Sequence, residues 1–214
     1  MIKLEAIDDI QPSTYNPRSA DPERLDLIEL SLHKLGFLAP IFADSNGEIL
    51  SGHQRHLVAS RMGAKQLPVF RTKPMDLEQR KALNIVFNRA TNDFDWNSTP
   101  EKVTRELAAL DVQKLAAAIP DKDINSPEFI RCLHPNQVSV KELCRANSNR
   151  WMQYARNLAR TLHRHGILMP IVCRKDGTVV NGIGRLEMLA EKKIETAPVV
   201  YVSDDEANFA QAMM

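Results

Sequence analysis

The chain repeats part of itself. Residues 32–70 align with residues 162–200 without a gap at a constant offset of 130. Eleven of the 39 aligned pairs are identical, whereas chance would give about two or three. The identical pairs are Leu32/Leu162, His33/His163, Gly36/Gly166, Leu38/Leu168, Pro40/Pro170, Ile41/Ile171, Gly47/Gly177, Gly52/Gly182, Arg55/Arg185, Pro68/Pro198 and Val69/Val199. The chain is therefore predicted to contain two copies of one structural unit.

Each copy is predicted to have the same order of helices and strands. Pro22 begins a helix with apolar residues at helical spacing, and Gly36 ends it. Asn46-Gly47 is a strong hairpin signal between two short strands. The first copy is predicted to have strands at 40–42, 48–50 and 67–70 and a helix between Gly52 and Gly63; the second, helices at 150–165 and 183–193 and strands at 170–173, 178–181 and 198–202. Residues 76–90 and 100–118 are predicted to be helical.

Composition excludes several protein classes. Hydrophobic residues make up 43% and charged residues 26% of the chain, which is typical of a globular protein and not of a disordered one. No apolar run approaches the roughly 18 residues of a membrane span, and the N-terminus lacks the regions of a signal peptide, so we expect a cytoplasmic protein without a membrane partner. Three scattered cysteines indicate neither disulfides nor zinc, and the net charge of +1 argues against coating DNA by bulk electrostatics.

The strongest chemical signal lies between Gly52 and His56. A glycine between a strand and a helix lets the backbone approach a ligand, and the first free amides of the helix can bind an anion. Arg55 lies in the first turn, where its guanidinium can bind a phosphate through two hydrogen bonds, and His53 and His56 can move protons. The return of Gly182 and Arg185 in the second copy favours function over a surface arginine on a capped helix.

Other residues near this signal leave alternatives open. Glu48 could act as a general base, although a solvated carboxylate in a hairpin is commoner, and the same holds for Asp44. The spacing of His53 and His56 is compatible with a metal, but no third ligand accompanies them, so we predict no metal site. We assign His53 and Glu48 as the candidate catalytic residues.

The sequence also resembles the ParB and sulfiredoxin superfamily. The resemblance rests on Gly36-Phe37-Leu38-Ala39-Pro40-Ile41, on Gly47 to Arg55, on Gly63 with Leu67-Pro68-Val69, and on the upstream Asn16-Pro17-Arg18. In ParB proteins comparable segments hold CTP, and in sulfiredoxin and ADP-dependent serine kinases they hold the phosphates of ATP or ADP. The run Ala82 to Arg89, followed by Asp95-Trp96, is similar to ParB-like nucleases of phages and plasmids.

This resemblance implies a fold, a domain division and a set of binding residues. It implies an α/β (α+β) fold, with small mixed sheets and helices in domains at 1–96 and 138–214, joined by a helical connector at 97–137. The implied nucleotide- or phosphate-binding residues are Asn16, Arg18, Gly36, Pro40, Gly52, His53, Gln54, Arg55, His56 and Asn88, with Gly182, Gly184 and Arg185 in a degenerate second copy. Phe87 and His53 stand where ParB proteins carry glutamates, which leaves magnesium and the choice of CTP open.

Three functions follow from these observations. The favoured one is a nucleotide-binding protein that takes CTP, ATP or ADP and acts as a hydrolase or phosphotransferase linked to the DNA transactions of a phage or plasmid. The second is a DNA-binding nuclease or an accessory of DNA modification, and the third is a degenerate scaffold that binds a partner protein. A homodimer is one possible assembly, and the second copy is expected to be mainly structural or regulatory.

Overall fold

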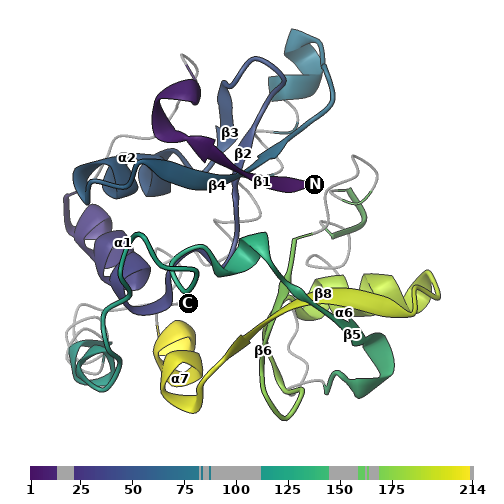
Figure 1. Cartoon of the computed structure of the whole chain (residues 1–214). Helices are drawn as coiled ribbons and strands as arrows, with labels where there is room; N and C mark the ends of the chain where they lie inside the picture. The colour runs from purple at the N-terminus through teal and green to yellow at the C-terminus, as the bar shows by residue number, and fades with distance from the viewer. Residues whose placement is uncertain are drawn as a thin grey trace, which may run out of the picture.

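The computed structural model of the chain contains two four-stranded mixed sheets with helices packed against them (Figure 1). It describes residues 1–13, 22–81, 83, 87, 112–144, 159–161, 163 and 169–212. The predicted binding residues Asn16, Arg18 and Asn88 lie outside the described residues, as do Gly166 and most of the helix predicted at 150–165. The predicted α/β fold class is confirmed.

The two sheets share one strand order. The first contains β1 (Ile2–Ala6), β2 (Ile41–Ala43), β3 (Ile49–Ser51) and β4 (Gln66–Arg71) in the order β1-β4-β2-β3. The second contains β5 (Asn136–Ser139), β6 (Ile171–Arg174), β7 (Val179–Asn181) and β8 (Thr196–Val202) in the order β5-β8-β6-β7. In each sheet the central pair is parallel and the outer pairs are antiparallel.

The register of the strands repeats together with their order. Ile41 lies opposite Val69 in the first sheet, and Ile171 lies opposite Val199 in the second, which is the offset of 130 found in the sequence. The β2–β3 hairpin and the β6–β7 hairpin each carry a shift in strand register at the matching place, after Phe42 and after Val172. The repeat is therefore a repeat of backbone geometry as well as of sequence.

Helices flank both sheets. They are α1 (Pro22–Leu35), α2 (His53–Arg61), α6 (Ile183–Glu191) and α7 (Asp204–Ala212), together with the short 3-10 helices η1 (Ile7–Asp9), η2 (Arg131–Leu133) and η3 (Val140–Glu142). Among the described residues of the predicted helical stretches, residues 77–81, 83, 87 and 112–117 are helical. The bounds of α1, α2 and α6 agree with the prediction to within two residues.

Among the described strands and α-helices, β1, β5 and α7 were not predicted from the sequence. β5 buries only Val138 between polar neighbours, so it carries no hydrophobic pattern. Lys3 lies opposite Val69 and Asn136 lies opposite Val199, so β5 is placed three residues later than the offset of 130 would put it. This shift hides the N-terminal part of the repeat from an alignment without gaps.

Part of the connector packs into the first repeat. Phe129 and Cys132 are fully buried in the core that contains Ile41 and Val69. The backbone N–H of Phe37 donates to the carbonyl oxygen of Phe129 at 2.5 Å, and the two rings meet edge to face at 5.5 Å. Residues near 129 therefore complete the first core, while the predicted division into domains stays a prediction.

A further hydrophobic core joins the two repeats. Leu35 of α1 packs there with Val172 and Val180 of the second sheet and with Phe209 of α7. Helix α1 also contacts α7 directly. The two repeats therefore bury apolar surface against each other, and this burial stabilises their arrangement.

Candidate functional site

Gly52 begins α2 in the left-handed region of the backbone. Its φ is +101°, and a Cβ at this position would lie 2.7 Å from the Cδ1 of Ile41. Gly182 begins α6 in the same way, with φ +106°, and its Cβ would lie 2.8 Å from a guanidinium nitrogen of Arg185. Only glycine fits both requirements, so these two glycines are fixed by backbone geometry.

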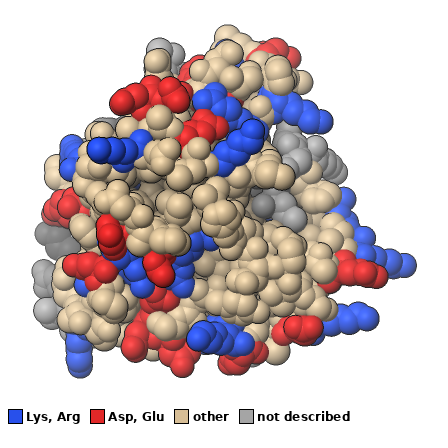
Figure 2. Space-filling view, viewed as in Figure 1, with Lys and Arg blue, Asp and Glu red and all other residues tan. Residues whose placement is uncertain are grey.

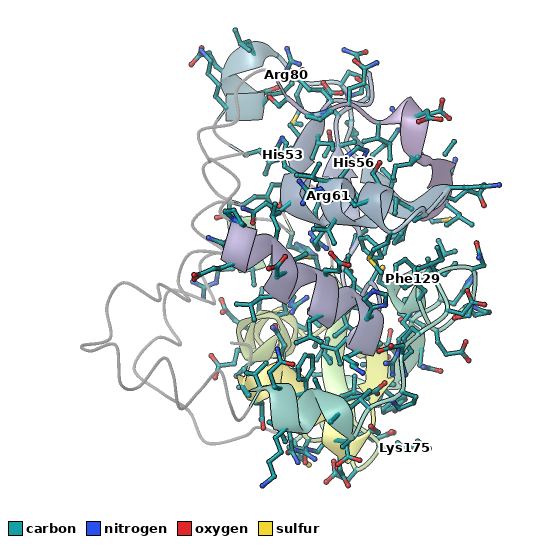
Figure 3. The ribbon with its side chains drawn as sticks, turned by 90° about the vertical axis from the view of Figure 1, so that its left-hand side faces the viewer. His53, His56, Arg61, Arg80, Phe129 and Lys175 are labelled. Atoms are coloured by element: carbon teal, nitrogen blue, oxygen red, sulfur yellow. The ribbon has the colours of Figure 1, made fainter. Side chains whose placement is uncertain are left out.

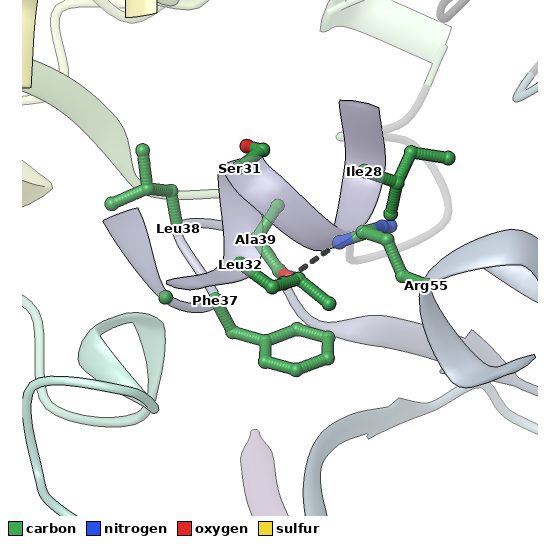
Figure 4. Close-up of a pocket in the computed structure, with 8 residues that line it drawn as sticks. Ile28, Ser31, Leu32, Phe37, Leu38, Ala39 and Arg55 are labelled. Atoms are coloured by element: carbon green, nitrogen blue, oxygen red, sulfur yellow. Dashed lines mark hydrogen bonds between the residues drawn. The ribbon is translucent and has the colours of Figure 1, made fainter. Parts of the chain in front are cut away.

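Arg55 reaches back from the first turn of α2 to the loop that precedes β2. Its Nη1 donates a hydrogen bond to the carbonyl oxygen of Ala39 at 2.6 Å (Figure 4). Burial lowers the pKa of Arg55. No carboxylate pairs with it in the part of the chain that the structure describes. A partly buried cation without a counter-ion is costly, which favours an anion beside it.

A pocket of about 190 Å³ lies beside this guanidinium. It is lined by Arg55 together with Ile28, Ser31, Leu32, Gly36, Phe37, Leu38 and Ala39 (Figure 4). Typical ligand pockets measure roughly 300–1,000 Å³, so this one has room for a phosphate group or one end of a larger molecule. The sequence reasoning singled out Gly36 and Arg55 and missed Ser31, which no motif marked.

The buried thiol of Cys132 also lies near Arg55. Burial raises the pKa of Cys132 to about 12, and the charge of Arg55 opposes this rise. The thiol is therefore neutral at physiological pH and does not supply the missing counter-ion. Cys132 lies in the stretch predicted to be a connector, and sequence spacing gave no sign that it would approach α2.

His53 and His56 both project from α2 (Figure 3). The backbone N–H of Ser13 lies 3.4 Å from the Nε2 of His53, which can accept its hydrogen. The Nε2 of His56 lies 3.3 Å from the carbonyl oxygen of Ile7, to which it can donate. His56 thus links α2 to η1. His53 contacts Ser13, which is the last described residue before the stretch that contains Asn16.

Glu48 contacts an arginine that the sequence reasoning missed. The Nη1 of Arg80 donates to the Oε2 of Glu48 at 2.7 Å and to the Oδ2 of Asp44 at 3.1 Å. Asp44 is only 2% exposed and also accepts the backbone N–H groups of Asn46 and Glu48. These contacts give both carboxylates a structural role in the β2–β3 hairpin; the action of Glu48 as a base stays a prediction.

The other described site residues, Gly36, Pro40 and Gln54, lie in the loop before β2 or on α2. Gly36 has φ +66°, and a Cβ there would lie 2.6 Å from the carbonyl oxygens of Glu128 and Phe129. Pro40 is buried directly before β2, and Gln54 is half-buried on α2. The structure therefore brings Gly36, Gly52 and Arg55 together and places Pro40 beside them.

Arg185 repeats the contact of Arg55 and adds a second one. Its Nη1 donates to the carbonyl oxygen of Pro170 at 2.6 Å, and its Nη2 donates to the Oδ1 of Asn181 at 2.9 Å. Burial lowers the pKa of Arg185 to about 10. Gly184 is buried inside α6. Ser51 occupies the position of Asn181 in the first repeat and makes no hydrogen bond to Arg55 in the structure.

The described residues offer no metal site and no membrane span. Among them, no group of three or more histidine, cysteine, aspartate or glutamate side chains could hold a metal ion. No helix within the described ranges is long and apolar enough to cross a membrane.

Comparisons with known proteins agree on one resemblance. No protein-family model matches the chain. The chain is 25% identical over 80 residues, which are 37% of its length and 92% of the relative, to the ParB-like nuclease domain-containing protein YnaK of Escherichia coli (strain K12).

Two solved structures of ParB proteins are also similar. One is C-terminally truncated ParB of Caulobacter crescentus complexed with CTP-gamma-S, with 22% identity and a TM-score of 0.39 over 54% of this chain. The other is a Pnob8-like ParB-N domain, with 16% identity and a TM-score of 0.36 over 55% of this chain. The matches span 62% and 48% of those chains. The match to the relative from Escherichia coli confirms the resemblance predicted from the sequence: the chain is similar to a ParB-like nuclease domain-containing protein.

Proposed function

We propose that the first repeat binds the phosphate groups of a nucleoside di- or triphosphate, of which CTP, ATP and ADP are the candidates. One observation carries the proposal: the guanidinium of Arg55 is partly buried beside a pocket, without a carboxylate partner among the described residues. A phosphate would supply the missing charge. The ParB structure complexed with CTP-gamma-S is a relative for which such a ligand is recorded.

Gly52, Arg55 and His53 each have a separate role in the proposed phosphate binding. Gly52 exposes the first amides of α2, which can donate to phosphate oxygens and add the positive end of the helix dipole. Arg55 uses one nitrogen to hold Ala39 and keeps its Nη2 for the ligand. In this proposal His53, at the first position of α2, donates a proton to a phosphate oxygen or to a leaving group after its Nε2 releases the backbone N–H of Ser13 and takes up a proton. Assistance by His53 is part of this proposal: water (in hydrolysis) or an acceptor hydroxyl (in transfer) attacks the terminal phosphorus, the bond to the bridging oxygen breaks, and His53 protonates the nucleotide that leaves.

The described residues offer no set of carboxylates that could bind magnesium. Asp44 and Glu48 are both hydrogen-bonded to Arg80, whose positive charge opposes a cation between them. The proposed binding therefore uses no metal held by these carboxylates, and the nucleotide would bring with it any ion that it requires.

The test is nucleotide-dependent thermal stability of the wild type and of Arg55→Ala, with CTP, ATP, ADP and GTP, each with and without magnesium. A ligand at 100 times its dissociation constant should stabilise the wild type by about 2.7 kcal/mol. Arg55→Ala should lose this gain. Because the substitution also removes the contact with Ala39, each variant is compared with itself with and without nucleotide.

Arg61→Ala is the matched control, because Arg61 lies exposed at the far end of the same helix. It should keep the full gain. Equal stabilisation of the wild type and Arg55→Ala by one nucleotide would overturn the assignment of Arg55, and the absence of a gain in the wild type would overturn nucleotide binding.

A backbone phosphate of DNA is the second candidate for the same anion site. The similarity to the ParB-like nuclease domain-containing protein YnaK of Escherichia coli favours it. Figure 2 shows acidic and basic side chains interspersed on the face in view, without a continuous basic stripe. DNA binding that weakens steeply with salt, together with no response to free nucleotides, would favour this candidate.

A further inference from the structure

The two arginines differ in one donor. In the first repeat the Nη2 of Arg55 makes no hydrogen bond to a described residue, whereas in the second repeat the Nη2 of Arg185 donates to the Oδ1 of Asn181. Both Nη1 atoms donate to a backbone carbonyl in the loop before the parallel strand, at 2.6 Å in each case. The second contact of Arg185 therefore has no counterpart in the first repeat.

This difference follows from a single position in the sequence. Ser51 ends β3 directly before Gly52, and Asn181 ends β7 directly before Gly182. The amide oxygen of asparagine stands one bond further from the backbone than the serine hydroxyl and can accept from an arginine. The shared strand register and the left-handed glycines place both side chains at the same point relative to the helix that follows.

We propose that Asn181 keeps the second repeat from binding phosphate, by holding the guanidinium nitrogen that Arg55 leaves available in the first repeat. An arginine binds phosphate best with two parallel N–H donors, and Asn181 occupies one of them. In the second repeat the same site is then blocked by Asn181. The residue before the glycine, Ser51 in the first repeat and Asn181 in the second, determines which repeat binds a ligand. This inference rests on the proposed function, in which Arg55 binds phosphate.

Exchanging serine and asparagine at these two positions should exchange the ability of the two repeats to bind phosphate. Asn181→Ser should open the second repeat, and Ser51→Asn should close the first. Asn181→Asp is the control for Asn181→Ser, because a carboxylate at this position would hold the guanidinium at least as firmly. All of these variants keep both arginines and both glycines.

The experiment is isothermal titration calorimetry of the full chain with CTP, ATP, ADP and inorganic pyrophosphate at constant ionic strength. The wild type and Asn181→Asp should each bind one equivalent, and Asn181→Ser should bind two. Ser51→Asn should weaken binding by about tenfold or more, a loss of about 1.4 kcal/mol. The double variant Arg55→Ala with Asn181→Ser should bind one equivalent, now in the second repeat.

The outcomes separate the inference from the proposed function. If the wild type binds one equivalent and Asn181→Ser still binds one, the inference is wrong while the proposed function stands. Two equivalents on the wild type would also overturn the inference. If the wild type binds none of the four compounds, the proposed function fails and the inference fails with it. Melting curves confirm that each variant is folded, and if Ser51→Asn does not fold, Asn181→Ser decides.

Discussion

Glu206 of α7 accepts a hydrogen bond from Arg131 of η2, with 2.9 Å between Oε1 and Nη1. Lys122 lies 2.8 Å from the same oxygen, and Arg131 also donates to the carbonyl oxygen of Tyr201. Glu206 is only 5% exposed. The segment that carries Lys122 and Arg131, and whose Phe129 lies in the first core, is thus joined by ion pairs to α7 of the second repeat.

Removing the charge of Glu206 should destabilise the protein. Glu206→Ala would leave Arg131 and Lys122 without their buried partner, and we expect a loss of about 3–5 kcal/mol in the free energy of unfolding, measured by urea denaturation. Glu191→Gln is the control, because Glu191 pairs with Arg160 at the surface, where an ion pair is worth about 0–1 kcal/mol. Similar losses in the two variants would contradict the buried network.

The same group predicts a dependence of stability on pH. Burial raises the pKa of Glu206. Hydrogen bonds from Lys122, from the backbone of Ser203 and from Arg131 lower this pKa by more than burial raises it, so the pKa lies below its ordinary value. A lowered pKa means that the stabilisation is complete above the pKa of the unfolded chain, about 4.3, and is lost as the pH falls through the folded pKa. Wild type should therefore lose more stability than Glu206→Gln between neutral and acid pH. Parallel pH profiles would show that Glu206 does not contribute.

Alanine at Gly52 should destabilise the protein more than alanine at Gly63. Both glycines have positive φ, so either substitution should cost about 1–2 kcal/mol in backbone strain. A Cβ at Gly63 would meet nothing within 4 Å, whereas one at Gly52 would lie 2.7 Å from Ile41. Urea denaturation of both variants measures the difference. Equal losses would mean that the contact with Ile41 relaxes without cost.

Substitutions at Glu48 decide between its structural contact and its predicted chemistry. If Glu48 serves mainly to hold Arg80, Glu48→Gln should reduce stability by about 1 kcal/mol and leave nucleotide-dependent stabilisation unchanged. A double-mutant cycle with Arg80→Gln should give a coupling energy of at least about 0.5 kcal/mol. If Glu48→Gln instead abolishes turnover while the coupling is near zero, Glu48 acts as the base that the sequence suggested.

The three thiols should react at very different rates. Cys144 is exposed, whereas Cys132 and Cys173 are buried. Burial raises the pKa of Cys132 to about 12 and, together with the charge of Asp176, that of Cys173 to about 11. A thiol reagent at pH 8 should therefore label one cysteine rapidly in the folded protein and all three in urea. Cys144→Ser identifies the fast site, and rapid labelling that persists in this variant would contradict the burial of the other two.

Local sequence signals predicted much of each repeat. Gly36, Gly47 and Gly52 determine where helices begin or end and where strands turn, because the left-handed backbone conformations that they adopt are open to few other residues. Apolar spacing predicted α1, and the repeated identities predicted the same order of helices and strands in both copies; the shared register of Ile41 with Val69 and of Ile171 with Val199 agrees with this prediction. The candidate site at Gly52 and Arg55 came from the same local pattern.

What the tertiary structure decided depends on contacts between residues far apart in the chain. Phe129 enters the first core, Arg80 binds Glu48, and Arg131 binds Glu206; no spacing in the sequence links these partners. β5 forms because β8 offers an open edge, although its own residues are mostly polar. By itself the sequence determined the repeated backbone, since turns and helix ends depend on neighbouring residues. Which side chains became buried, paired or left available was decided only when distant segments packed together, since burial and charge pairing depend on the whole fold.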